Sequence, residues 1–318
     1  MKDRILVTPY ANPDLDGTAC AFAYAELLIK SGKNAVAAVS GTLHKEAQFV
    51  LNKFNIKSLL NAEDLIKEVE GVILVDASDT QGISSKIDPK KVIEIIDHRK
   101  INESDKFPNA KVHIELVGSA ATLIAEKFFN SQIPMSTESA ALLFSAICSN
   151  TINFQANVTT PRDHKMAVFL KTKFPLPKNY VHEMFSYKSA LNETLKLRLS
   201  HEIATFKFNL YSLGIVQLEL MDSSNFINEN LEEIQKILLE LKKEKTLDLI
   251  FLTCIDVEKG FNEFVTVDKI TEELVEEVLK VKFHDSIAKR KGILMRKEIV
   301  PLIKEELEKS RSIKVQKI

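Results

Sequence analysis

Short apolar segments that favour β-strands alternate with helix-patterned segments through the first half of this 318-residue chain. The strand-like segments are Ile5–Thr8, Ala35–Ser40, Gly71–Asp76, Val92–Asp97 and Val112–Leu116. The helix-like segments between and after them are Gly17–Ser31, Lys45–Phe54, Ala62–Val69, Ala120–Asn130 and Ser136–Thr151. Alternation of this kind predicts an α/β domain with a largely parallel, doubly wound sheet that is covered on both faces.

Three of the predicted strands lead into acidic residues at or just beyond their carboxyl ends, the edge where such sheets bind ligands. These residues are Asp14 and Asp16 after the first strand, Asp76 after the third, and Asp97 followed by His98 after the fourth. Carboxylate oxygens are the ligands of hard divalent cations, and an imidazole beside them adds a nitrogen donor. The pattern predicts a metal site at this edge, with a carboxylate orienting the second imidazole nitrogen.

The segment around Asp14 also has a simpler interpretation. Aspartate is a favoured helix N-cap, and Gly17 permits a tight turn, so Asp14-Leu15-Asp16-Gly17 is a good helix start without any metal. The repetition of acidic strand ends favours the metal site over capping alone.

The pattern loosens around Lys171–Leu195, where Pro175 and Pro177 break the preceding helix before a second set of elements begins. Paired strands, a long amphipathic helix and further strands follow from His201 onward, which predicts a smaller α+β domain with its own core. We therefore expect a first domain over 1–187, a linker over 188–200 and a second domain over 201–318.

Composition excludes several classes of protein. Lys+Arg 43 against Asp+Glu 44 gives a net charge of −1, which argues against a protein that coats duplex nucleic acid. No apolar run approaches the roughly 20 residues of a membrane span, and the start of the chain does not look like a signal peptide. Cys20, Cys148 and Cys254 lie far apart in apolar segments, which is typical of buried thiols in a cytoplasmic protein.

Six short motifs occur in an order and spacing typical of one known superfamily. They are Asn12–Gly17, Leu74–Asp76, Asp97-His98, Gly118–Thr122, Ser145–Thr151 and Met295–Pro301. On these motifs the chain resembles the DHH phosphoesterase superfamily, in the branch with manganese-dependent (family II) inorganic pyrophosphatases and exopolyphosphatases.

The resemblance implies roles for individual residues. Asp14, Asp16, Asp76 and His98 would be metal ligands, with Asp76 bridging two cations, and Asn150 occupies a further metal-binding position. Asp76 and His98 would also act in catalysis. Arg99, Arg296 and Lys297 would bind the phosphate groups of the substrate in an active-site cleft between the two domains.

Four positions depart from the pattern of that family. Tyr10 stands where the pyrophosphatases have a histidine, Arg99 replaces the second histidine of Asp-His-His, Asn150 replaces an aspartate, and Ala204 aligns with a lysine. Tyrosine and asparagine are weaker ligands than the residues they replace, whereas arginine can bind phosphate.

The expected activity is that of a hydrolase that uses Mn²⁺ or Mg²⁺ to cleave the phosphoanhydride bonds of pyrophosphate or short polyphosphate. Two alternatives stay open: a phosphate- or nucleotide-binding relative without catalysis, and a phosphodiesterase for short oligonucleotides or cyclic nucleotides. The expected partner is a small phosphate-containing substrate, with no membrane and no duplex nucleic acid, and a homodimer is an open option.

Overall fold

The computed structural model describes residues 4–100, 102–190, 194–208 and 211–315. The chain forms two compact units, which we describe separately. The first contains Met1–Phe154 and Val158–Tyr187, and the second contains Gln155–Asn157 and Lys188–Ile318. Among the described helices, none is long and apolar enough to cross a membrane.

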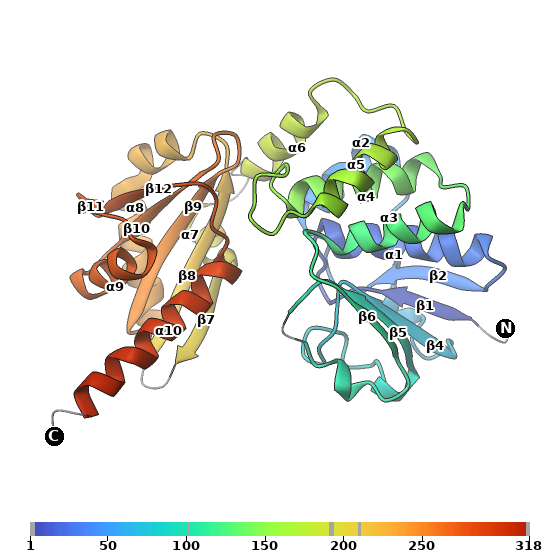
Figure 1. Cartoon of the computed structure of the whole chain (residues 1–318), viewed down its shortest axis with the longest axis horizontal. Coiled ribbons are helices and arrows are strands. Elements are labelled where there is room, and N and C mark those ends of the chain that lie inside the picture. Colours follow the sequence, from blue (N-terminus) through green and yellow to red (C-terminus); the bar gives the residue numbers. More distant parts are fainter. Residues whose placement is uncertain (1–3, 101, 191–193, 209–210, 316–318) are drawn as a thin grey trace. The chain divides into compact units, whose positions relative to one another are not determined.

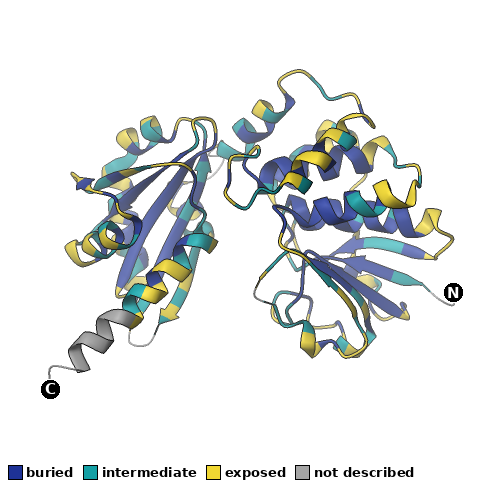
Figure 2. Cartoon of the chain, in the orientation of Figure 1, coloured by how far each residue is buried: buried dark blue, intermediate teal, exposed yellow. Residues whose placement is uncertain are grey.

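The first unit is built on a sheet of six parallel strands in the order β3-β2-β1-β4-β5-β6, which confirms the predicted parallel sheet (Figure 1). The strands are β1 (Ile5–Thr8), β2 (Ala35–Val39), β3 (Leu60–Asn61), β4 (Gly71–Val75), β5 (Val92–Asp97) and β6 (Lys111–Ile114). Every residue of β4 is buried, as expected for a central parallel strand covered on both faces (Figure 2).

Helices cover one face of this sheet. They are α1 (Leu15–Lys30), α2 (Lys45–Lys53), α3 (Ala120–Ser131), α4 (Thr137–Asn150), α5 (Pro161–Lys171) and α6 (Tyr180–Ser189). Helix α1 contacts β1, β2 and β4, and it also packs against α3 and α4 on the same side of the sheet (Figure 1). The carboxyl end of α4 and the amino ends of α1 and α3 are consequently brought together.

Short turns and loops, rather than α-helices, cover the opposite face. Ile66, Ile83 and Phe107 pack there against sheet residues such as Leu74 and Ile95. The prediction of a helix over Ala62–Val69 was wrong: only Ala62–Asp64 forms a single 3-10 turn, and further turns follow it. A segment this short is a marginal helix, and Ala62, Ile66 and Val69 still bury their side chains in this core.

The second unit contains a mixed sheet of six strands in the order β11-β12-β10-β9-β8-β7. The strands are β7 (Ile203–Phe208), β8 (Tyr211–Leu220), β9 (Leu249–Asp256), β10 (Phe261–Thr266), β11 (Phe283–His284) and β12 (Ile287–Lys291). The helices are α7 (Leu195–Glu202), α8 (Ser223–Glu244), α9 (Lys269–Leu279) and α10 (Arg296–Val315). Among the neighbouring strands that the structure describes here, β8 and β9, which α8 connects, pair in parallel and the other pairs are antiparallel, so the predicted α+β class is confirmed.

In the segment 188–200, which was expected to form a linker, helix α7 contributes to this second unit. Leu195 and Leu199 of α7 are buried in its core together with side chains of α8 and β8.

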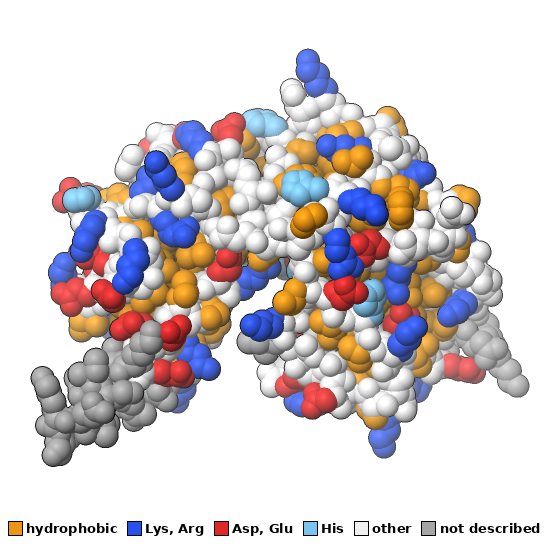
Figure 3. Space-filling view, viewed as in Figure 1, with side chains coloured by type: hydrophobic (Ala, Val, Ile, Leu, Met, Phe, Trp, Pro, Cys, Tyr) orange, Lys and Arg blue, Asp and Glu red, His pale blue; other side chains and the backbone are white. Residues whose placement is uncertain are grey.

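Over the surface shown in Figure 3, Lys and Arg side chains lie among Asp and Glu, in keeping with the net charge of −1.

The strand order of the first unit determines where a ligand can bind. The chain moves from β1 outward to β2 and β3 on one side, and from β4 outward to β5 and β6 on the other. The carboxyl ends of β1 and β4 therefore form a topological switch point, where open α/β sheets bind ligands.

Candidate metal centre

Asp16, in the first turn of α1, is fully buried and held by the amino end of α3. Its Oδ1 atom accepts hydrogen bonds from Ser119 Oγ (2.9 Å) and Ala121 N (2.8 Å), and its Oδ2 atom accepts one from Ala120 N (2.8 Å). A helix amino end provides free N–H groups and a positive dipole. These bonds fix a carboxylate inside the protein, with one oxygen toward the switch point.

Asp76 follows β4 and has a left-handed backbone, with φ of 51°. The residue is 2% exposed, and its Oδ1 atom has no hydrogen-bond partner among the described residues. The nearest charged groups are His98 Nε2 at 3.5 Å and Arg99 Nη2 at 3.8 Å. Burial and then the negative charge of Asp16 raise the pKa of Asp76 to about 7, against the opposing attraction of His98.

His98 follows β5, and its two ring nitrogens have different surroundings. Nδ1 lies 3.0 Å from the carbonyl oxygen of Val117, whereas Nε2 lies 3.5 Å from Asp76 Oδ1 and 3.8 Å from Asp16 Oδ2. The predicted orientation of this ring by a carboxylate was wrong, because the backbone carbonyl of Val117 takes that place. Burial alone would lower the pKa of His98, but the attraction of Asp76 and Asp16 raises it to about 9.

The carboxylate before His98 has another function in the structure. Asp97 is fully buried and accepts hydrogen bonds from Ser78 Oγ and from the backbone N–H of His98 (2.7 Å). It therefore stabilises the turn that carries the imidazole and does not face the ring nitrogens.

Ligand atoms of Asp16, Asp76 and His98 all lie within 4.8 Å of one another. Within the described part of the chain, no other group of three His, Cys, Asp or Glu side chains converges in this way. A buried oxygen without a partner requires an explanation, because desolvation of a polar group is costly. Two carboxylates and an imidazole suit a divalent cation such as manganese, so these residues fit a metal site.

Two other predicted ligands have different contacts. Asp14 Oδ1 accepts a hydrogen bond from Gly17 N (3.1 Å) and caps α1, and this carboxylate is not part of the converging group. Asn150, at the carboxyl end of α4, donates from Nδ2 to Asp16 Oδ2 (2.5 Å). The amide nitrogen of Asn150, rather than its carbonyl oxygen, therefore faces the carboxylate.

Arg99 and Tyr10 form a second layer beside Asp76. The guanidinium of Arg99 donates from Nη2 to the backbone carbonyl of Asp76 (2.9 Å) and lies 5.2 Å from the centre of the Tyr10 ring. The hydroxyl of Tyr10 accepts a hydrogen bond from Asp14 N (3.1 Å). Burial, followed by the charges of Asp14 and Asp76, raises the pKa of Tyr10 far above its usual value, so the phenol stays neutral.

The predicted phosphate-binding residues of the second unit lie at the start of α10. Arg296 donates from Nη1 to the carbonyl oxygens of Glu202 (2.6 Å) and Ile215 (3.1 Å), and its backbone N–H donates to Gln217 (2.6 Å). Lys297 is exposed, and Ala204 lies on β7 opposite Ile215. Arg296 is thus anchored within its own unit by one nitrogen of its guanidinium.

Asp163 is a buried residue of this region that the sequence analysis did not identify. Its carboxylate accepts hydrogen bonds from Gly118 N (3.0 and 3.1 Å) and from Thr122 Oγ1 (2.5 Å), and it closes a capping box with Thr160. It thereby fixes residues 117–122, which carry the carbonyl bound to His98 and the N–H groups bound to Asp16. In the sequence, Thr160-Pro161-Arg162-Asp163 has the pattern of a helix start, and this pattern was the signal that could have pointed to Asp163.

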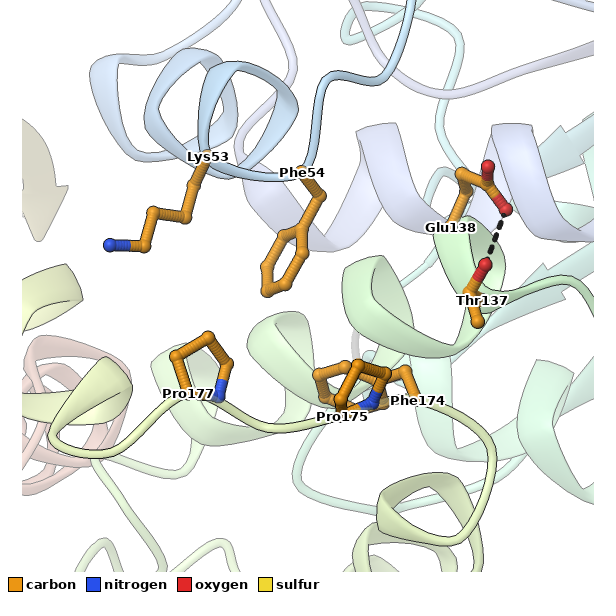
Figure 4. Close-up of a pocket in the computed structure, with 7 residues that line it drawn as sticks. All are labelled: Lys53, Phe54, Thr137, Glu138, Phe174, Pro175 and Pro177. Carbon is orange, nitrogen blue, oxygen red and sulfur yellow. Dashed lines mark hydrogen bonds between the residues drawn. The ribbon is translucent and has the colours of Figure 1, made fainter.

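A cavity of about 360 Å³ in the first unit lies elsewhere (Figure 4). Its lining consists of Lys53, Phe54, Thr137, Glu138, Phe174, Pro175 and Pro177. Thr137 begins α4 and Asn150 ends it, so about 20 Å of helix separates this cavity from the metal centre. The cavity contains none of the converging residues.

Comparison with known proteins agrees with this geometry. The model of the N-terminal domain of the DHH family matches residues 4–147, which include Asp16, Asp76 and His98. The segment that matches the DHH family therefore contains the whole converging group.

Similar proteins match this chain over nearly its full length. A "Probable manganese-dependent inorganic pyrophosphatase" of Bacillus mycoides is 28% identical over 306 residues, covering 95% of this chain and 98% of the relative. A candidate family II inorganic pyrophosphatase of Methanococcus jannaschii has a solved structure with a TM-score of 0.74 and 28% identity, covering 95% of this chain and 98% of that one. An exopolyphosphatase-related protein of Bacteroides fragilis shares the fold at a TM-score of 0.51 and 17% identity, covering 98% of this chain and 93% of its own.

Proposed function

We propose that this protein is a divalent-metal-dependent phosphohydrolase that cleaves the phosphoanhydride bonds of pyrophosphate or short polyphosphate. The observation that carries the proposal is the buried, unpartnered oxygen of Asp76 beside Asp16 and His98 at the switch point of the sheet that matches the DHH family. The names of the full-length relatives support pyrophosphate as the substrate.

Asp16, Asp76 and His98 would hold the cation, Mn²⁺ or Mg²⁺. When bound, the cation neutralises phosphate charge and makes water a better nucleophile at neutral pH. The protein fixes the three ligands before binding, because Asp16 is anchored by α3 and His98 by the Val117 carbonyl. Such preorganisation avoids a conformational cost during the reaction.

Arg99 would bind and orient the substrate phosphate. Its side chain is 34% exposed, and hydrogen bonding to the Asp76 carbonyl and stacking over Tyr10 restrict its movement. Guanidinium groups bind phosphate oxygens with two parallel hydrogen bonds and retain their charge at all relevant pH values. Arg296 and Lys297 are further candidates for phosphate binding, and Asp14 and Asn150 for metal binding.

The proposal includes action in the cytoplasm. Cys20, Cys148 and Cys254 are buried free thiols, which agrees with a reducing compartment.

The direct test is phosphate release from pyrophosphate and from tripolyphosphate by purified protein, with Mn²⁺ or Mg²⁺ and after chelation. We expect release that requires the metal and that falls at least about 100-fold in His98→Gln. His113→Gln is the matched control, because His113 lies on the edge strand β6 and pairs with Glu115. Folded, metal-supplied protein that releases no phosphate from either substrate would refute the proposal.

A further inference from the structure

We infer that the metal centre holds one divalent cation per chain, and that the guanidinium of Arg99 supplies the second positive charge beside Asp76. This inference deepens the proposed function, since both depend on Asp16, Asp76 and His98. It concerns the number of cations and is independent of which phosphoanhydride is cleaved.

The guanidinium of Arg99 lies directly beside Asp76. Its Nη2 atom is 2.9 Å from the Asp76 carbonyl oxygen and 3.8 Å from Asp76 Oδ1, the oxygen that has no hydrogen-bond partner. His98 Nε2 lies 3.5 Å from the same oxygen. The ligand nitrogen of His98 and the permanent positive charge of Arg99 therefore already occupy two of the directions from which a cation could approach Asp76.

Carboxylates hold the guanidinium of Arg99 in place. Its Nη1 atom lies 3.5 Å from Asp79 Oδ2, and its Nε atom lies 3.8 Å from Asp97 Oδ1. Together with Asp76, three acidic side chains surround this guanidinium. A second divalent cation beside Asp76 would be repelled by this fixed charge, because like charges at short range in a buried site disfavour each other strongly.

Potential donors to a second cation on the β1 side of Asp76 already have other contacts. Asp14 Oδ1 accepts a hydrogen bond from Gly17 N (3.1 Å) at the start of α1, and the Tyr10 hydroxyl accepts one from Asp14 N (3.1 Å). The Tyr10 ring lies under the guanidinium at 5.2 Å. A neutral phenol in this position is a poor ligand for manganese and a good stacking surface for arginine.

Asn150 contacts the carboxylate of Asp16. Its Nδ2 atom donates to Asp16 Oδ2 at 2.5 Å, so an amide proton satisfies part of the charge of that carboxylate. A neutral side chain here also leaves the centre with fewer anionic oxygens. Fewer anionic ligands require fewer cations for neutralisation.

The experiment counts bound Mn²⁺ in the full-length protein. Metal-free protein is titrated with Mn²⁺ by calorimetry, and the loaded protein is then examined by electron paramagnetic resonance, which separates isolated from paired Mn²⁺ ions. We expect one Mn²⁺ per chain with the spectrum of an isolated ion. Two Mn²⁺ per chain, or the spectrum of a coupled pair, would overturn the inference.

Matched variants test the part assigned to Arg99. Tyr10→His/Arg99→His exchanges the stacked pair for two neutral nitrogen donors, and we expect the stoichiometry to rise from one to two. Arg99→Lys keeps the charge and should still bind one. Two outcomes would show that the charge of Arg99 does not set the number of Mn²⁺ ions bound per chain. One is a second ion in Arg99→Lys, and the other is a single ion in the folded Tyr10→His/Arg99→His variant.

The hydrolysis assay separates the two proposals. Hydrolysis with two bound Mn²⁺ would refute the single-cation inference and leave the proposed function intact. One bound Mn²⁺ without hydrolysis would refute the function and leave the inference intact. Protein that binds no Mn²⁺ would refute both.

Discussion

Both units contain buried carboxylates, and two neighbouring pairs, Asp16 with Asp76 and Asp256 with Glu263, differ in how their oxygens are satisfied. In the second unit, Asp256 accepts hydrogen bonds from the N–H groups of Ser223 (3.0 Å) and Lys259 (2.7 Å). Its neighbour Glu263 accepts from the hydroxyls of Ser223 (3.0 Å) and Ser224 (2.8 Å). These acids connect β9 and β10 to the amino end of α8, and each oxygen has a protein donor.

In the first unit, the protein satisfies Asp16 but not Asp76. Ser119, Ala120 and Ala121 donate to Asp16, whereas Asp76 Oδ1 has no donor among the described residues within hydrogen-bonding distance. Burial of carboxylates alone therefore does not distinguish a cation site from a structural contact. The distinguishing feature is an oxygen that the protein leaves unpaired in a place from which water is excluded.

The largest expected effect follows from removing the charge of Asp76. Asp76→Asn should lower hydrolysis at least about 100-fold because a cation ligand is lost. The same change should stabilise the metal-free protein by about 1–3 kcal/mol, because burial and the charge of Asp16 disfavour the ionised Asp76 side chain despite His98 and Arg99 beside it. Phosphate release and calorimetric unfolding without metal measure the two effects. A variant that unfolds at a lower temperature than the wild type would show that Asp76 is satisfied after all.

The next largest effect is expected from replacing either of two fully buried structural carboxylates, Asp163 and Asp256. Alanine at either position leaves several donors unpaired and should cost about 2–4 kcal/mol of unfolding free energy. Only Asp163→Ala should also weaken Mn²⁺ binding, by about 10–100-fold, because Asp163 fixes the segment that positions Asp16 and His98.

Denaturant unfolding and Mn²⁺ titration measure this difference between the two alanine variants. Asp163→Asn, which retains an acceptor for Gly118 N, should recover part of the Mn²⁺ affinity. Equal Mn²⁺ affinity in Asp163→Ala and Asp256→Ala would remove Asp163 from the positioning of the metal ligands.

The smallest effect is expected from replacing Glu63, a carboxylate near the surface whose two oxygens both have partners. Hydrogen bonds from Lys86 and Ser84 lower its pKa to about 2, so its stabilising contribution is present above about pH 4.5 and is lost as the pH falls toward 2. Glu63→Gln should therefore destabilise the protein at pH 5 by up to about 1 kcal/mol, a small value because solvent screens the pair. The difference from wild type in urea unfolding should shrink at pH 3, and a constant difference would contradict this assignment.

Much of the first unit could be predicted because its signals are local. The strands β1, β2, β4 and β5 are apolar runs of the expected length, and their carboxyl ends meet at one edge in any parallel sheet. The proximity of Asp16, Asp76 and His98 in the structure therefore agrees with the order of these residues along the chain.

Other parts of the centre depend on contacts that residue types do not encode. The orientation of His98 comes from a backbone carbonyl, at Val117, and any residue type could carry it. Asp163 acts on Gly118 from 45 positions away, and only the packing of α3 against α5 brings them together. The two-residue strand β11 is too short for a periodic pattern.

The left-handed backbone at Asp76 limits which amino acids can serve at this position. Among side chains, asparagine and aspartate tolerate such a φ most readily, and glycine tolerates it without a side chain. Glycine provides no ligand, asparagine provides no charge, and glutamate would strain the turn. A library with all twenty residues at position 76, selected for hydrolysis, should therefore return aspartate alone.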